Sequence, residues 1–205
     1  YEYCVGWVDL LHLKKEQFRG VILAGNHLED SEKIEYLKET RELNFPFTPP
    51  FSLVNQFSLY FLNSFYFYMN KRKKSYITNY RSFFFPLDII NYWNKAYGRK
   101  GFYQYQFVIP KKNATYFFKE FISELKKSKE TPALTVLKSF GNIASLGTLS
   151  FPREGVTMAI DFQNKGDHTL NFMKKLDNIV MKYNGAIYPA KDARMSKNIF
   201  ERSFS

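Results

Sequence analysis

The alternation within Tyr103–Ile109 is the sequence feature that most constrains how this chain can fold. Tyr and Phe side chains and Ile109 alternate there with Gln104, Gln106 and Val108, which is the period-two pattern of a β-strand. Pro110 ends the strand. Apolar residues at helical spacing follow it, and Asn113 stands where a helix cap is expected. The pattern therefore predicts a strand that leads directly into a helix.

Four further elements follow in the C-terminal half. Ala133–Phe140 and Val156–Phe162 have the composition of strands, and residues 170–180 repeat apolar side chains at helical spacing until Asn184 and Gly185. A short last strand is expected at Ala186–Tyr188. The order strand–helix–strand–strand–helix–strand is typical of ferredoxin-like domains. We therefore predict an α+β fold with a ferredoxin-like βαββαβ core, a mainly antiparallel sheet and helices on one face.

The N-terminal half has a weaker pattern. Tyr3–Leu10 and Gly20–Ala24 are expected to be strands that extend the same sheet. Ser31–Leu43 is charged and is interpreted as a helix or a loop over the surface. Asn44–Pro50 contains three prolines, which predicts an irregular connection.

Composition limits the chemistry more than the fold. The 205 residues are 45% hydrophobic, enough for a sizeable core. No run of about eighteen apolar residues predicts a membrane-spanning helix, and the first residues lack the pattern of a signal peptide. Cys4 is the only cysteine, which excludes an internal disulfide, and three scattered histidines predict no metal site.

The chain is basic, with 30 Lys and Arg against 19 Asp and Glu. Nucleic acid, an anionic membrane surface or a phosphorylated substrate could each explain the excess. Four consecutive basic residues, Lys71–Lys74, follow an aromatic stretch over 57–69. This arrangement suits a segment at a lipid interface. It equally suits a buried element that ends in a solvated loop.

Four segments, in this order and spacing, resemble the substrate domain of one group of flavin enzymes. They are Gly101–Pro110, Leu137–Gly141, Leu149–Phe162 and Ala190–Arg194. The group is the decaprenylphosphoryl-β-D-ribose 2′-oxidase type of FAD-linked oxidase, within the vanillyl-alcohol-oxidase superfamily. The resemblance implies that residues 1–205 form the substrate-binding (cap) domain of a larger FAD-dependent oxidase. It also implies that the flavin domain lies outside this chain, which alone should be inactive. The sequence contains no glycine-rich dinucleotide-binding motif, which agrees with that expectation.

The resemblance also implies a reaction. Such an oxidoreductase passes a hydride from the 2′-carbon of a polyprenyl-phosphoryl pentose to N5 of the FAD flavin. A separate NAD(P)H-dependent keto-sugar reductase would then complete a ribose-to-arabinose epimerisation that feeds cell-wall arabinan. The expected location is cytoplasmic, or peripheral at the inner face of the cell membrane.

Site residues follow from the resemblance, position by position. Lys191 is expected to be catalytic and to contact the flavin, because a cation there would stabilise the charge that develops on the ring. It could also help remove the hydroxyl proton. Asp192 and Arg194 are expected to hold the turn around it. The residues expected to bind substrate are Gln106, Lys138, Thr157, Ala159, Phe84, Leu87, Gln104 and Trp7.

Some of these positions depart from the family pattern. Thr157 and Ala159 stand where the family often has Asn and Cys, and Phe84 stands where it tends to have Tyr. From the residues alone, the two glutamines could simply face solvent, Lys191 could pair with Asp192, and Trp7 could be a core residue.

Two other functions stay open at this point. An aldonolactone or other sugar oxidase of the same superfamily would act on a soluble substrate, and membrane binding would separate it from the lipid-linked case. A ferredoxin-like RNA-binding module is a different class. The strand at Tyr103–Ile109 lacks the signature of that class, so no nucleic acid partner is expected.

Overall fold

A computed structural model describes residues 1–14, 17–28, 42–71, 75–85, 90–143, 146–147 and 149–204. Its centre is a six-stranded sheet in which every neighbouring pair is antiparallel. The strand order is β2-β1-β6-β7-β5-β8. The strands are β1 (Tyr3–Lys14), β2 (Gln17–Gly25), β5 (Phe102–Ile109), β6 (Pro132–Phe140), β7 (Gly155–Gln163) and β8 (Ala186–Ile187).

The C-terminal half confirms the predicted ferredoxin-like core. Helix α3 (Lys111–Ser128) connects β5 to β6, and α4 (Asp167–Lys182) connects β7 to β8. The first strand of this unit lies between its third and its fourth strand, as the split βαβ pattern requires. The N-terminal strands extend the sheet at the β6 edge, where Trp7 of β1 faces Val136. The predicted α+β class and its N-terminal extension are both confirmed.

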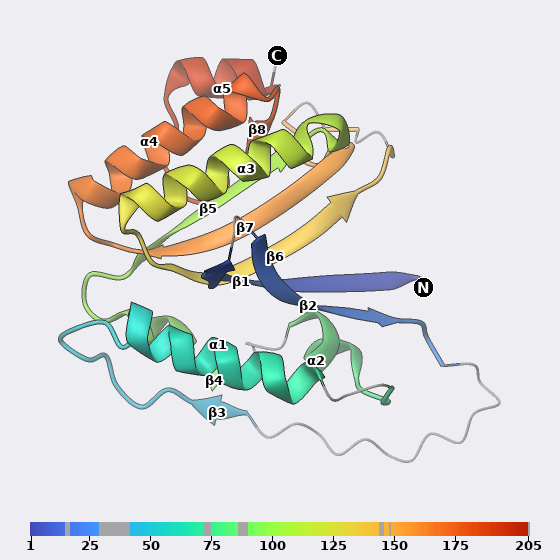
Figure 1. Cartoon of the computed structure of the whole chain (residues 1–205), viewed down its shortest axis with the longest axis vertical. Coiled ribbons are helices and arrows are strands. Elements are labelled where there is room, and N and C mark those ends of the chain that lie inside the picture. Colours follow the sequence, from blue (N-terminus) through green and yellow to red (C-terminus); the bar gives the residue numbers. More distant parts are fainter. Residues whose placement is uncertain are drawn as a thin grey trace.

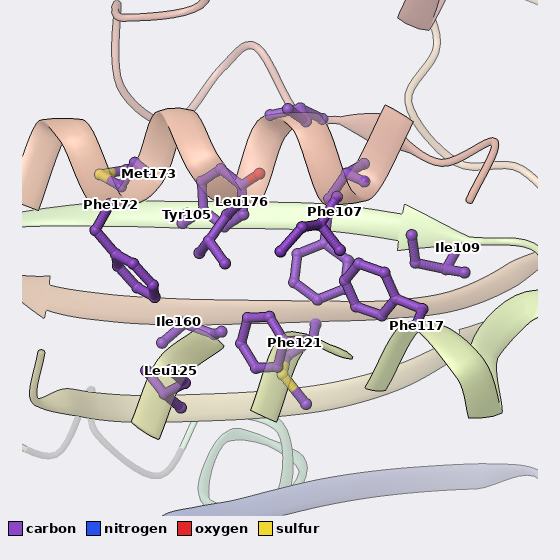
Figure 2. Close-up of a cluster of buried hydrophobic side chains, with 14 of the residues drawn as sticks. Tyr105, Phe107, Ile109, Phe117, Phe121, Leu125, Ile160, Phe172, Met173 and Leu176 are labelled. Carbon is purple, nitrogen blue, oxygen red and sulfur yellow. The ribbon is translucent and has the colours of Figure 1, made fainter. Parts of the chain in front are cut away.

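The core fills the space between the sheet and the helices α3 and α4, which lie side by side on one face (Figure 1). Figure 2 shows aromatic and aliphatic side chains from both layers meeting there. Phe107 of β5 packs against Phe117 and Phe121 of α3, with ring centroids 4.8 and 5.8 Å away. Phe117 and Phe121 are one helical turn apart, so a single stripe of α3 reaches the sheet.

The predicted cap of α3 is wrong. The helix begins at Lys111, directly after Pro110, and Asn113 lies inside its first turn. The Asn113 side-chain amide instead donates to the carbonyl oxygen of Tyr183 at 2.8 Å. Asn113 therefore joins the start of α3 to the end of α4.

The opposite face of the sheet also carries a helix. Residues 57–69, left open at sequence level as an interfacial or buried element, lie in α1 (Gln56–Lys71). This helix lies across β1 on the side away from α3 and α4 (Figure 1). Asn63 of α1 donates to the buried carboxylate of Asp9 at 2.8 Å, and Arg19 of β2 donates to the same carboxylate at 2.7 Å. The two helices of the ferredoxin-like core, α3 and α4, lie on one face as predicted, whereas α1 covers part of the opposite face.

Short elements complete the fold. Strands β3 (Leu43–Asn44) and β4 (Ile90–Asn91) form a parallel pair, followed by the 3₁₀ helix η1 (Trp93–Tyr97). The others are α2 (Tyr80–Phe84) and α5 (Lys197–Phe204). The expected helix or loop at Ser31–Leu43 falls almost entirely outside the described residues. Among those that are described, no helix is long and apolar enough to cross a membrane.

Candidate functional site

The candidate site is the face of β5, β6 and β7 that points away from α3 and α4. On β5, Tyr105 and Phe107 belong to the core, so Gln104 and Gln106 point to the other side. On β7, Met158 and Ile160 are core residues, and the residues between them alternate in the same way. The residues on this open face are Gln104, Gln106, Val136, Lys138, Thr157, Ala159 and Asp161.

Strand register brings the predicted substrate residues into rows. Gln106 lies opposite Ala159, Ala159 lies opposite Val136, and Val136 lies opposite Trp7. In the next row, Lys138 lies opposite Thr157. The Gln106 side-chain amide donates to the Thr157 hydroxyl at 3.3 Å. Residues spread over 150 positions of sequence therefore meet on four adjacent strands.

Two small apolar clusters stand at the ends of this polar face. One contains Tyr97 with Trp93 and Phe102, at the start of β5. The other contains Phe151 with Val108 and Tyr188, at the end of β5. Trp93 packs in the first cluster, with its ring centroid 5.7 Å from that of Phe102. A ligand on the face would meet hydrogen-bonding groups in the centre and apolar surface at both ends.

Asp161 is the most unusual group on the open face, because it is an acidic residue that is only 2% exposed. Gln104 Nε2 donates to its Oδ1 at 3.0 Å, and the Tyr97 hydroxyl donates to its Oδ2 at 3.2 Å. Burial raises the pKa of Asp161 to about 6, although both hydrogen bonds and the charge of Lys191 oppose that rise. Asp161 therefore changes its charge close to neutral pH.

The Tyr97 phenol keeps its proton over the pH range in which Asp161 changes its charge. Burial, together with the neighbouring carboxyl of Asp161, raises the pKa of Tyr97 well above its ordinary value. Tyr97 is therefore a fixed donor to Asp161.

Lys191 reaches the open face through Gln104. The Lys191 Nζ donates to Gln104 Oε1 at 3.4 Å and lies 6.0 Å from the centre of the Tyr188 ring. An ionised carboxylate only accepts hydrogen bonds, so Asp161 fixes which end of the Gln104 amide it meets. The amide nitrogen faces Asp161, which leaves the carbonyl oxygen for Lys191. Asp161 thereby sets the position of Lys191 through one intervening side chain.

The turn around Lys191 is held from two sides. Asp192 Oδ2 accepts a hydrogen bond from the backbone amide of Gln104 at 2.6 Å. Arg194 donates to both carboxylate oxygens of Asp177 on α4, each at 2.8 Å. Its guanidinium also lies over the Tyr105 ring, at 4.9 Å. Both side chains bind protein groups, in the manner expected of residues that hold this turn.

The three remaining predicted residues have different surroundings. Trp7 packs against Tyr66 of α1, with ring centroids 4.8 Å apart. Phe84 of α2 packs edge-on against Tyr3, at the beginning of β1 and away from the Gln106 row. Leu87 lies outside the described residues.

No sequence pattern indicated that Tyr97 and Asp161 form a pair. Asp161 has the same strand parity as Thr157 and Ala159, which would have placed it on the open face. Tyr97 comes from a 3₁₀ helix, where no alternation could reveal its direction. Across the described residues, no three His, Cys, Asp or Glu side chains lie close enough together to hold a metal ion.

The geometry also bears on the RNA-binding alternative. A ferredoxin-like RNA-binding sheet stacks bases on aromatic side chains of its open face. Here Tyr105 and Phe107 are fully buried beneath the helices, and amides occupy the open side of β5. The face is suited to hydrogen bonding with a hydroxylated ligand.

Comparison with curated proteins finds a relative that matches over the whole chain. No protein-family model matches the chain. Over 212 aligned residues and its whole length, the chain is 30% identical to decaprenylphosphoryl-beta-D-ribose oxidase of Mycolicibacterium smegmatis. It spans 45% of the length of that relative. The chain is therefore homologous to one part of this oxidase, in agreement with the resemblance seen in its sequence.

Proposed function

Because the whole chain is homologous to part of an oxidase that acts on a lipid-linked ribose, we propose that it is the substrate-binding domain of an FAD-dependent oxidoreductase. The proposed reaction oxidises the 2′-hydroxyl of a polyprenyl-phosphoryl pentose. One observation carries the proposal: the predicted residues Gln104, Gln106, Lys138, Thr157, Ala159 and Lys191 gather on or beside one open sheet face.

The groups on this face fit a flavin and a sugar. A bound flavin would supply the hydride acceptor. Lys191, beside the open face, offers a cation that would stabilise negative charge developing on the flavin ring. The Gln106 amide offers a donor and an acceptor for sugar hydroxyls, and its hydrogen bond to the hydroxyl of the buried Thr157 would orient it. Lys138, which is exposed, offers a charge for the phosphate.

Asp161 contributes positioning in this scheme. Through Gln104 it holds the amide carbonyl towards Lys191, so that the lysine is placed before a ligand arrives. The apolar clusters around Tyr97 and Phe151 would exclude water from the two ends of the face. The chain by itself would bind and orient the sugar, and the flavin would be held mainly by the remainder of the protein.

The wider proposal includes a second step. A keto sugar formed here would be the substrate of an NAD(P)H-dependent reductase, and together the two reactions would epimerise ribose to arabinose for cell-wall arabinan. Thr157 and Ala159 in place of Asn and Cys change the groups that meet the sugar. This difference favours one alternative within the same chemistry, an oxidase of another sugar.

The test begins with visible absorbance of the full-length protein. We expect bound FAD that is bleached by a polyprenyl-phosphoryl ribose, and bleaching that is lost in Lys191→Ala. The matched control is Lys182→Ala, because Lys182 pairs with Glu120 on the outer surface of the helices. A colourless full-length protein would contradict the proposal. Equal bleaching in all three proteins would remove the role of Lys191.

A further inference from the structure

Helix α1 is apolar on both of its sides, although only one side is packed. The inner side carries Leu59 and Asn63, both buried, with Tyr66 against Trp7. The outer side carries Phe57, Phe61, Leu62, Phe65, Tyr68 and Met69, all exposed. A helix that is hydrophobic all round normally has partners all round. We call these six exposed residues the outer stripe.

The outer stripe is large and free of negative charge. Phe57 and Phe65 are 75% and 67% exposed, far more than is usual for a phenylalanine. Phe57 and Phe61 contact each other edge-on, with ring centroids 4.8 Å apart. The sequence of α1 contains no Asp or Glu, and Lys71 ends it. Contiguous apolar surface of this kind marks an interaction site.

The helix is held rigidly, so the outer stripe does not depend on local refolding. Asn63 donates to the buried Asp9 at 2.8 Å, and Arg19 donates to the Ser64 hydroxyl at 3.0 Å. The Arg19 guanidinium also lies over the Phe67 ring, at 4.7 Å. These contacts fix the inner side to β1 and β2. The outer side consequently points away from the sheet, and its side chains are exposed.

Charge distinguishes among the candidate occupants of this surface. The chain carries a net charge of +11, so two copies facing each other would repel. The residues proposed to meet the flavin and the sugar lie on the sheet, whereas the outer stripe points away from it. An anionic lipid surface complements both the aromatic side chains and the positive charge. Helix α1 has 16 residues, fewer than a membrane-spanning helix needs.

We propose that α1 docks flat on an anionic lipid surface, with the outer stripe entering the headgroup region and Lys71 contacting lipid phosphates. This inference goes beyond the proposed oxidation, since it requires neither flavin nor sugar. It would place the open sheet face, and a lipid-linked substrate, next to the membrane.

The test measures cosedimentation of the full-length protein with vesicles. One set contains phosphatidylglycerol and phosphatidylcholine, and the other contains phosphatidylcholine alone. We expect binding to the anionic vesicles that falls with added salt and is much weaker for the neutral ones. The triple variant Phe57→Ser, Phe61→Ser and Phe65→Ser should bind to the anionic vesicles at least about tenfold more weakly than the parent protein. Circular dichroism of each variant verifies its fold.

Two further variants keep the result specific. The matched control replaces three exposed apolar residues elsewhere, Ile22→Ser, Ile143→Ser and Leu149→Ser, and should bind as the parent does. Lys71→Glu should weaken binding to anionic vesicles only. Equal binding by the stripe variant and the control would overturn the proposal. So would a stripe variant that changes the oligomeric state, because a second copy would then cover the stripe. Vesicles without any sugar phosphate keep this outcome separate from that of the flavin experiment.

Discussion

The two faces of strand β5 differ as sharply as any two regions of the molecule. On one face Tyr105, Phe107 and Ile109 are buried beneath α3 and α4 (Figure 2). On the other, Gln104 and Gln106 form hydrogen bonds with Asp161 and Thr157. A single strand with a period of two thus supplies both the core and the candidate site. Neighbouring residues of one strand can therefore stabilise the core on one side and, in the proposed function, bind a ligand on the other.

The largest expected effect comes from the core face. Phe107→Ala should lower the free energy of unfolding by about 3–5 kcal/mol, because it leaves a cavity against Phe117 and Phe121. Gln106→Ala, the next residue along the strand, should lower it by less than about 1 kcal/mol. Urea denaturation of both variants measures the difference. An equal loss of unfolding free energy in both variants would contradict the division of roles between the two faces.

The next effect is a dependence of stability on pH that originates from the open face. The pKa of Asp161 is raised from 3.8 to about 6 in the folded protein, so between these values the folded state binds more protons than the unfolded state. The stability that this group contributes is fully present below pH 3.8 and is lost as pH rises through about 6. The difference in pKa corresponds to about 3 kcal/mol.

Asp161→Asn should remove this dependence. Urea denaturation at several pH values between 4 and 7 checks it, with the exposed Asp167→Asn as the matched control. The control should keep the pH dependence of the parent protein. A parent protein whose stability does not fall across this interval would contradict the assigned burial of Asp161.

The last prediction is that modifying the thiol of Cys4 has no effect on activity. Ala159, on the open face, carries no thiol, and the only cysteine of these 205 residues, Cys4, lies on β1 and is exposed. Alkylation of Cys4 in the full-length protein should therefore leave sugar oxidation unchanged, and Cys4→Ser should behave as the parent does. Activity before and after alkylation gives the answer. Inhibition that disappears in Cys4→Ser would show that the site extends to Cys4.

Sequence reasoning succeeded where a short period decided the structure. The alternation around Tyr105 predicted a strand with Gln104 and Gln106 on one face, and a second strand was predicted at Val156–Phe162. It could not predict the Asp161–Tyr97 contact, because 64 residues and an irregular helix separate the two side chains. The sequence also did not indicate which face of the sheet α1 covers, because the outer stripe of this helix is as apolar as its inner side. Charge and aromatic content showed that this segment was unusual, and only the buried Asp9–Asn63 contact showed how it is held.

The most direct test of the central claim, that the open face binds the sugar, compares two glutamines. The affinity of the full-length protein for a polyprenyl-phosphoryl ribose would be titrated by flavin absorbance for Gln106→Ala and for Gln17→Ala, an exposed residue of β2. We predict that Gln106→Ala weakens binding about tenfold, the effect of losing one good hydrogen bond, and that Gln17→Ala leaves it unchanged. Unchanged affinity in both variants would contradict the assignment of the open face as the substrate site.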